Sequence, residues 1–115
     1  MPAPKPARVE LLQGTLDLLV LRTLLLGPLH GHGIGKAIQR NSEDMLLVDH
    51  GSLYPALHRL VRKRWLASEW QDTRKGRPMK FYRLTAAGRR QLATERSNWE
   101  MVCRAIGLVL EGVQG

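Results

Sequence analysis

The 115-residue sequence predicts one mainly α-helical domain that contains a small β-hairpin. The length suits a single domain, so a second independent core is not expected. Apolar residues recur at helical spacing in several segments, and two short segments with alternating side chains flank one polar turn. A chain of this length buries enough surface to fold without disulfides, and its single cysteine, Cys103, has no intrachain partner.

The first helix is expected to run from about Glu10 or Thr15 to Leu26, after a disordered or partly helical lead over residues 1–13. Its leucines face almost all directions, so the helix should be buried on more than one side. The pair Gly27-Pro28 ends it, because proline cannot continue a helix.

A second helix is predicted over His32–Arg40, with its apolar side chains turned inward. The glycines in and just before it oppose this prediction, since each costs roughly 1 kcal/mol relative to alanine in a helix. After a turn, the short apolar segment Met45–Val48 is predicted as a brief strand.

A third helix is predicted over Gly51–Arg64, because Leu53, Leu57, Leu60 and Val61 form one apolar stripe. Pro55 is expected in its first turn, where a missing N–H costs little. A helix of this length, about 21 Å, can lie in a DNA major groove.

The opposite face and flanks of that helix carry the side chains that we expect to contact DNA, namely Ser52, Tyr54, Pro55, Arg59 and Arg62. Ser52 and the terminal amides suit one phosphate, and the Tyr54 hydroxyl suits another. Arg59 is long enough to bind guanine O6 and N7 together. The alternative is an ordinary solvated face on which Tyr54 only packs.

A hairpin follows, with strands near Trp65–Trp70 and Met79–Leu84 around a polar tip. Its cations are expected to reach phosphates or the minor groove; they are Arg74, Lys75, Arg77 and Lys80. The alternative is a solvated tip. The net charge is +8, and twelve of the 18 Lys and Arg residues lie between Arg59 and Arg96 with only three acids. Charge concentrated in one region favours a face that binds a polyanion.

The last helix should start after Thr85, which is a good N-cap. An apolar stripe with the spacing of a coiled coil follows, formed by Leu92, Trp99, Val102, Ile106 and Val109. Nothing later in the chain covers this stripe, so it packs on the first helix, on a second copy, or on both. Residues 14–84 are thus predicted as a winged helix-turn-helix DNA-binding domain and residues 85–115 as a dimerisation helix.

Three segments resemble the PadR-type transcriptional regulators, in that family's order: Leu24–Ile38, Gly51–Leu60 (GSLYPALHRL) and Phe81–Gly88 (FYRLTAAG). The short C-terminal arm resembles the subgroup with one C-terminal helix. Two places depart from the pattern and add basic character: His50, where an acid is common, and residues 62–64, where acids and a glycine are common.

The resemblance implies a transcriptional regulator that is a dimer, joined through the C-terminal helix and the N-terminal region. Some members of this family sense phenolic acids or toxic drugs, which bind in or near the dimer interface. From charge and resemblance together we expect a sequence-specific repressor on an inverted repeat with half-sites about one DNA turn apart. A small aromatic effector at the dimer interface would release it. Trp99 could stack on such a ligand; the alternative is plain interface packing.

Other functions stay open at this stage. A nonspecific chromosome-organising protein would use the same charge, and a winged-helix module could instead bind protein. RNA binding is less favoured, because exposed aromatic residues on a sheet face are not evident.

No catalytic constellation or cofactor motif is present, so an enzyme is not expected. The four histidines do not supply three converging metal ligands; they are His30, His32, His50 and His58. Cys103 fits a packed small residue in a reducing compartment. With no membrane segment or signal peptide predicted, the expected location is the cytoplasm, at the nucleoid.

Overall fold

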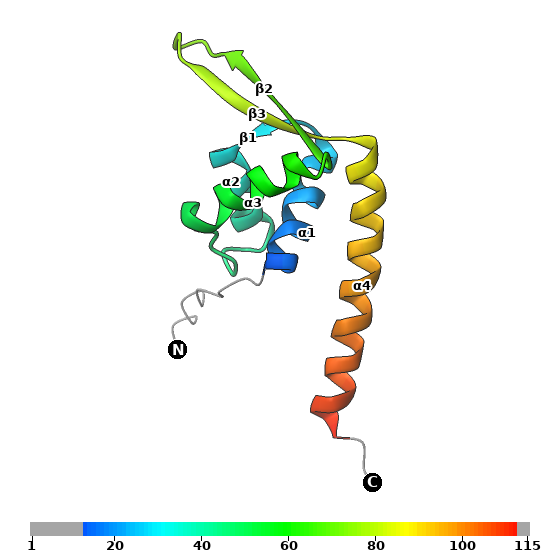
Figure 1. The fold of residues 1–115 in the computed structure, drawn as a ribbon. Coiled ribbons are helices and arrows are strands. Elements are labelled where there is room, and N and C mark those ends of the chain that lie inside the picture. The colour runs from blue at the N-terminus through cyan, green and yellow to red at the C-terminus, as the bar shows by residue number, and fades with distance from the viewer. Residues whose placement is uncertain (1–12, 113–115) are drawn as a thin grey trace, which may run out of the picture.

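The computed structural model describes residues 13–112, and Figure 1 shows their arrangement. The elements in chain order are α1 (Gln13–Thr23), the 3₁₀ helix η1 (Leu24–Leu26), β1 (Leu29–His30), α2 (Gly31–Asn41), α3 (His50–Arg62), β2 (Leu66–Asp72), β3 (Pro78–Leu84) and α4 (Ala86–Glu111). The predicted N-terminal lead lies outside the described residues except for Gln13, where α1 begins.

The helices α1, α2 and α3 pack around one apolar core, and the hairpin β2–β3 projects away from it (Figure 1). The sheet is antiparallel with the order β1-β3-β2. Leucines dominate the fully buried side chains, which include Leu21, Ile34, Leu53, Leu57 and Leu60. The predicted fold class, mainly helical with a small hairpin and a winged helix-turn-helix order, is confirmed.

Helix α4 lies along α1 and then extends beyond the body of the molecule (Figure 1). It is the longest described helix, with 26 residues, or about 39 Å at 1.5 Å per residue. Among residues 13–112, no helix combines the length and the apolar character that crossing a membrane would require.

The brief strand predicted at Met45–Val48 is wrong; the short strand of the sheet is Leu29–His30 instead. It pairs with β3 through Leu29 opposite Tyr82 and His30 opposite Phe81. The Met45–Val48 segment stays irregular, and the Ser42 hydroxyl accepts the amide of Leu46 at 3.0 Å. An apolar segment forms a strand only where a neighbouring strand offers backbone partners.

The start of α3 corrects the expected place of Pro55. The helix begins at His50 with Asp49 as its N-cap, so Pro55 is its sixth residue and lies in the second turn. There the proline leaves the Gly51 carbonyl without the usual donor four residues later. The helix ends at Arg62, two residues earlier than predicted, and Arg64 adopts a left-handed φ of 62°.

The junction between the hairpin and α4 depends on Thr85 and Gly88. As predicted, Thr85 caps α4, and its hydroxyl accepts the Gly88 amide at 2.9 Å. With Thr85 as the N-cap, a capping box would have an acidic residue at position 88. The sequence has glycine there, and the reason is steric. A Cβ on Gly88 would overlap the Trp65 carbonyl oxygen and lie 2.7 Å from Leu84 Cδ1.

We therefore expect Gly88→Ala to lower the free energy of unfolding by about 1–3 kcal/mol, because overpacking outweighs the better helix propensity of alanine. The matched control is Gly107→Ala in the same helix, where a Cβ would meet nothing within 4 Å. That change should be neutral or stabilise by up to about 1 kcal/mol. Urea unfolding at one protein concentration measures both, and equal effects would contradict the steric explanation.

Candidate nucleic-acid interface

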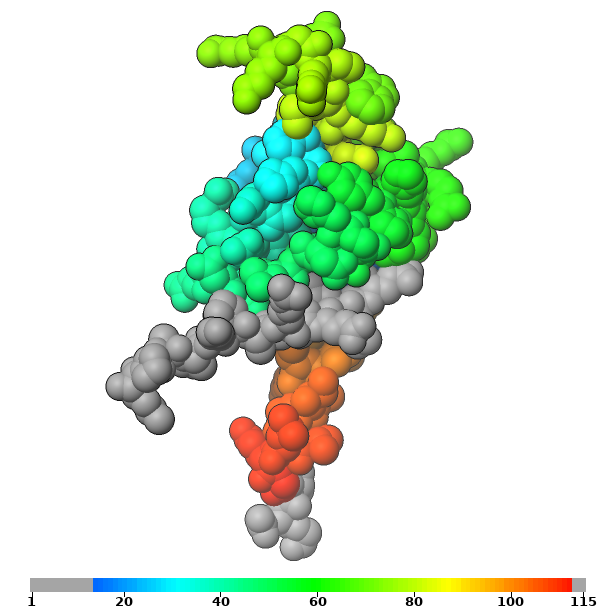
Figure 2. All heavy atoms as spheres, turned by 90° about the vertical axis from the view of Figure 1, so that its left-hand side faces the viewer, coloured from blue at the N-terminus to red at the C-terminus, as the bar shows by residue number. Residues whose placement is uncertain are grey.

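The hairpin, α2 and α3 share one face of the molecule. Figure 2 looks onto this face, with the hairpin at the top and parts of α2 (cyan) and α3 (green) below it. The tip is a tight turn in which the Thr73 hydroxyl donates to the Arg77 carbonyl at 2.8 Å, and the Gly76 amide donates to the Thr73 carbonyl at 2.9 Å. Gly76 has a φ of 74°, which favours glycine.

Three of the predicted cations, Arg74, Lys75 and Arg77, are exposed at this tip. The two ion pairs found among the described residues, Arg59 with Asp17 and Arg96 with Glu100, involve none of them. Like charges on a projecting turn repel and contribute nothing to folding. The positive charge of the tip is therefore not neutralised by any described ion pair.

Lys80 lies further down the hairpin, is half-buried, and has its Nζ 5.8 Å from the centre of the Tyr82 ring. Trp70 is its partner across the strands and is 67% exposed. Trp70 was not among the residues predicted to contact DNA, and its exposure corrects the expectation that the sheet carries no exposed aromatic residue. The available signal was the alternation of side chains between the two faces of a strand, which places Trp70 on the same face of β2 as Leu66. Trp70 lies further along the strand, where the core does not cover it.

The phosphate role predicted for Ser52 needs correction. The Asp49 carboxylate accepts the Ser52 amide at 2.8 Å and the Ser52 hydroxyl at 3.3 Å. The protein's own carboxylate thus occupies the donors that we expected to hold a phosphate. Pro55 and Arg62 remain exposed on α3 and stay candidates for DNA contact.

Arg59, expected to bind guanine, is instead held by Asp17 of α1. Its Nη2 donates to Asp17 Oδ1 at 2.6 Å, and the side chains of Arg59 and Asp17 are 22% and 9% exposed. The Arg59 Nε is buried without a hydrogen-bond partner among the described residues. Arg59 therefore ties α3 to α1 rather than reaching out to a base.

We expect Asp17→Asn to lower the free energy of unfolding by roughly 2–3 kcal/mol, because it leaves the guanidinium unpaired in a largely buried site. Glu100→Gln, which breaks the exposed pair with Arg96, should cost less than about 0.5 kcal/mol. Replacing both partners, Asp17→Leu with Arg59→Met, should recover much of the loss. Chemical denaturation tests all three, and a loss no larger than the Glu100→Gln control would show that the pair does not hold α3.

The Tyr54 side chain packs partly against the protein and is partly exposed to solvent. Its ring lies against Gly31, where an added Cβ would be 2.8 Å from Tyr54 Cε1, and the side chain is 38% exposed. Tyr82 of β3 is buried in the core. Burial, with a smaller contribution from the charge of Tyr54, raises the pKa of Tyr82. Tyr82 therefore stays neutral and supports the base of the hairpin from inside.

The stripe on α4 divides into two parts. Leu92 is buried in the protein's own core, so its predicted place in a dimer or effector surface is wrong. The rest of the stripe is exposed, from Trp99 at 47% through Val102 and Ile106 to Val109 at 77%. No described segment covers the C-terminal half of α4 (Figure 1).

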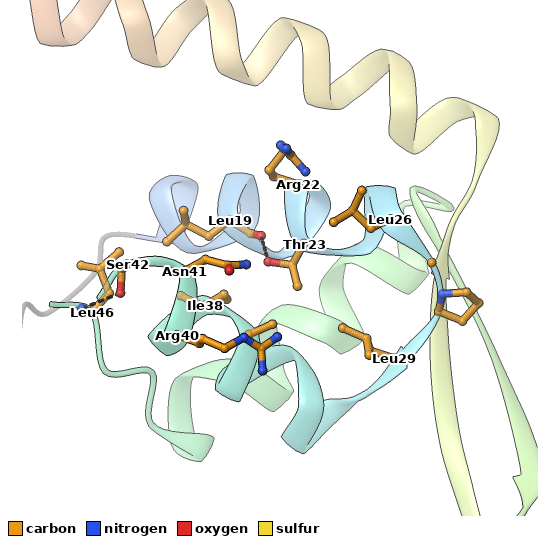
Figure 3. A pocket seen from close by; sticks show the side chains of 13 residues that line it. Leu19, Arg22, Thr23, Leu26, Leu29, Ile38, Arg40, Asn41, Ser42 and Leu46 are labelled. Carbon is orange, nitrogen blue, oxygen red and sulfur yellow. Dashed lines mark hydrogen bonds between the residues drawn. The ribbon is translucent and has the colours of Figure 1, made fainter. Parts of the chain in front are cut away.

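A groove of about 260 Å³ lies between α1 and α4, lined by Gly14, Thr15, Leu18, Glu95, Asn98, Trp99 and Val102. Trp99 thus borders both the exposed stripe and this groove. A second groove, of about 620 Å³, lies between α1 and α2 and does not include Trp99 (Figure 3). Leucines form much of its wall, and Arg22 and Arg40 stand among its lining residues.

The three-helix body, the antiparallel sheet and the projecting basic hairpin define a winged helix-turn-helix protein. The model of the "Transcriptional regulator PadR-like family" matches residues 20–94. The chain belongs to the PadR-like family of transcriptional regulators, as the resemblance of its sequence motifs predicted.

Individual relatives agree with this assignment. Transcriptional regulator Rv3488 from Mycobacterium tuberculosis is 32% identical over 97 residues, which are 84% of this chain and 87% of that protein. A PadR family transcriptional regulator from Eggerthella lenta has a TM-score of 0.76 and 33% identity, covering 88% of this chain and 86% of its own. A transcriptional regulator from Clostridium thermocellum has a TM-score of 0.77 and covers 89% of this chain and 96% of its own; its identity of 24% supports the fold alone.

Proposed function

We propose that this regulator is a repressor that binds a specific inverted repeat in double-stranded DNA as a homodimer. The observation that carries the proposal is the projecting hairpin tip, whose Arg74, Lys75 and Arg77 are exposed and take no part in the described ion pairs. The hairpin that carries this tip lies above α3 on the same face of the molecule (Figure 2). Cations in that arrangement suit two neighbouring stretches of a phosphate backbone.

The dimer is supported by α4, whose exposed apolar side chains make a poor surface for a monomer. A twofold axis at these helices would present two copies of the hairpin and α3 to one side of the DNA. Half-sites about 34–36 Å apart would then match the spacing of one helical turn.

We further propose that this regulator binds an aromatic effector. The α1–α4 groove already contains Trp99 and lies next to the stripe that a partner would cover. Its volume of about 260 Å³ is slightly below the usual range for ligand pockets, so a second copy would be needed to enlarge and close it. A flat ligand stacked on Trp99 would then favour one arrangement of the two protomers over another.

The rival is a nonspecific DNA-binding protein without an effector. Selection of bound duplexes from a random pool separates the two functions. A repressor should enrich an inverted repeat and bind it at least about 10³-fold more tightly than random duplex at near-physiological salt. A pool that binds without any enriched sequence would favour the rival, and a pool that is not retained would contradict both.

A further inference from the structure

Three of the four histidines form a row across the surface between the hairpin and α3. The His30 ring meets Phe81 of β3 edge-on, with 5.6 Å between centroids, and stacks within 10° of His32 at 6.3 Å. His32 meets His50 edge-on at 5.8 Å, and His50 meets Tyr54 edge-on at 5.6 Å. The row therefore joins the sheet, the start of α2 and the start of α3.

The three imidazole rings differ in whether their nitrogen atoms already take part in a described hydrogen bond. His30 is the N-cap of α2, and its Nδ1 accepts the Gly33 amide at 2.9 Å. The Nδ1 of His30 is therefore already used to cap α2. His32 and His50 are exposed, and no side-chain hydrogen bond involves either ring among the described residues. The ring nitrogens of His32 and His50 are therefore not used in any described hydrogen bond.

Charged and titratable groups surround His32 and His50, but no described acid forms a hydrogen bond or an ion pair with either ring. Asp49 precedes His50, but its two carboxylate oxygens are within hydrogen-bond distance of Ser52. Glu69 lies opposite Phe81 on β2 and accepts from Gln71 at 3.0 Å. Tyr54 borders His50, and Lys36, one turn after His32 on α2, is exposed and adds positive charge. The described ion pairs include neither His32 nor His50.

We propose that His32 and His50, in their doubly protonated forms, together bind one backbone phosphate of duplex DNA. This inference rests on the DNA-binding function proposed above. Two imidazolium rings about 6 Å apart repel each other, and an anion that contacts both rings offsets that repulsion. Each imidazolium offers N–H donors to phosphate oxygens. The pair lies on the side of α3 that carries Tyr54, which is already a candidate for contact with DNA.

The proposal predicts that DNA binding takes up protons. Imidazoles change charge between pH 5 and 8, so an excess proton bound in the complex makes affinity rise as the pH falls. The probe is a labelled mixed-sequence duplex of about 30 base pairs, titrated with the full-length protein at pH 7.5 and pH 6.0 at constant ionic strength. The wild-type Kd should fall about tenfold between the two values, and the log–log salt slope should steepen by about 0.9 for each added phosphate contact.

Replacing both rings, His32→Gln with His50→Gln, should leave the Kd at pH 6.0 within about twofold of its value at pH 7.5. The control is His58→Gln, which removes the exposed histidine of α3 that lies outside the row and should keep the acid-dependent gain. A third variant, His32→Arg with His50→Arg, carries permanent charge and should bind at pH 7.5 about as tightly as wild type binds at pH 6.0.

The outcomes are separable. An acid-dependent gain that persists in the double glutamine variant, or that disappears with His58→Gln alone, overturns the phosphate pair but not DNA binding. Tight binding with no pH dependence in the wild type does the same. Failure of the duplex to bind at either pH overturns the proposed function and the pair together. Thermal unfolding of each variant at both pH values confirms that the comparison is between folded proteins.

Discussion

Reversing the three cations of the hairpin tip, by Arg74→Glu, Lys75→Glu and Arg77→Glu, should weaken DNA binding by at least about 100-fold at physiological salt. The three side chains are exposed and take part in none of the described ion pairs, so their loss leaves the fold intact. Each lost phosphate contact should also lower the log–log salt slope by about 0.9. Fluorescence anisotropy over a range of salt concentrations measures both effects.

The matched control reverses three exposed cations elsewhere, Arg22, Arg40 and Arg104, and so produces the same change in net charge. Arg22 and Arg40 belong to the groove between α1 and α2, and Arg104 lies on α4. Net charge alone acts on association through the long-range field, which salt screens. The control should therefore lose much less affinity than the tip variant at physiological salt. Equal losses would mean that overall charge, not the hairpin tip, holds the DNA.

Local sequence patterns predict α3, the hairpin and most of α4 because each depends on its own periodicity. Each feature can be recognised from a short segment, equal in length to about one or two helical turns. These features are the apolar stripe of α3, the alternation of side chains on both sides of the polar tip, and the N-cap at Thr85. The element bounds differ from the prediction by only a few residues. Such features need no knowledge of what lies across the fold.

The features that sequence patterns miss depend on distant partners. Strand β1 has two residues and exists only because β3 pairs with it, whereas Met45–Val48 has an apolar pattern but no partner strand. Gly88 is explained by the Trp65 carbonyl rather than by its own helix. Contacts of this kind are set by packing between elements, for which one sequence offers no periodic signal.

The candidate site shows the same limit. Arg59 has a suitable side chain and lies on a suitable helix for contact with a base. Its guanidinium instead donates a hydrogen bond to Asp17, which lies 42 positions earlier in the chain. A lone acid within the leucine-rich first helix was the available signal, because a buried carboxylate needs a partner. The histidine row is equally hidden, since its members come from β1, α2 and α3.

Breaking the apolar stripe of α4, by Ile106→Glu with Val109→Glu, should convert a dimer into monomers at micromolar concentration. Ile106 is 52% exposed and Val109 is 77% exposed, and no described segment of the chain covers them. In a twofold interface the two changes occur on both protomers, so four carboxylates would be buried without partners. A rise in the dimer Kd of at least about 10³-fold is expected. Sedimentation at several concentrations measures it.

The control places the same two charges on the other side of α4, by Ala93→Glu with Ser97→Glu. Both positions are exposed and lie well away from the stripe on a helical projection. This variant should sediment like the wild type. The stripe variant should also keep its fold, because the core of α1, α2 and α3 does not include Ile106 or Val109. A stripe variant that remains dimeric would show that another surface joins the protomers.

The same variant tests whether dimerisation serves DNA binding. Joining two DNA-binding units makes the second contact intramolecular, so a dimer gains affinity for paired half-sites beyond that of either unit. The stripe variant should therefore lose about 10²-fold or more on the selected inverted repeat, but change little on a duplex with a single half-site. Equal losses on both duplexes would place the effect of α4 within one protomer, and the twofold operator would then have no structural basis.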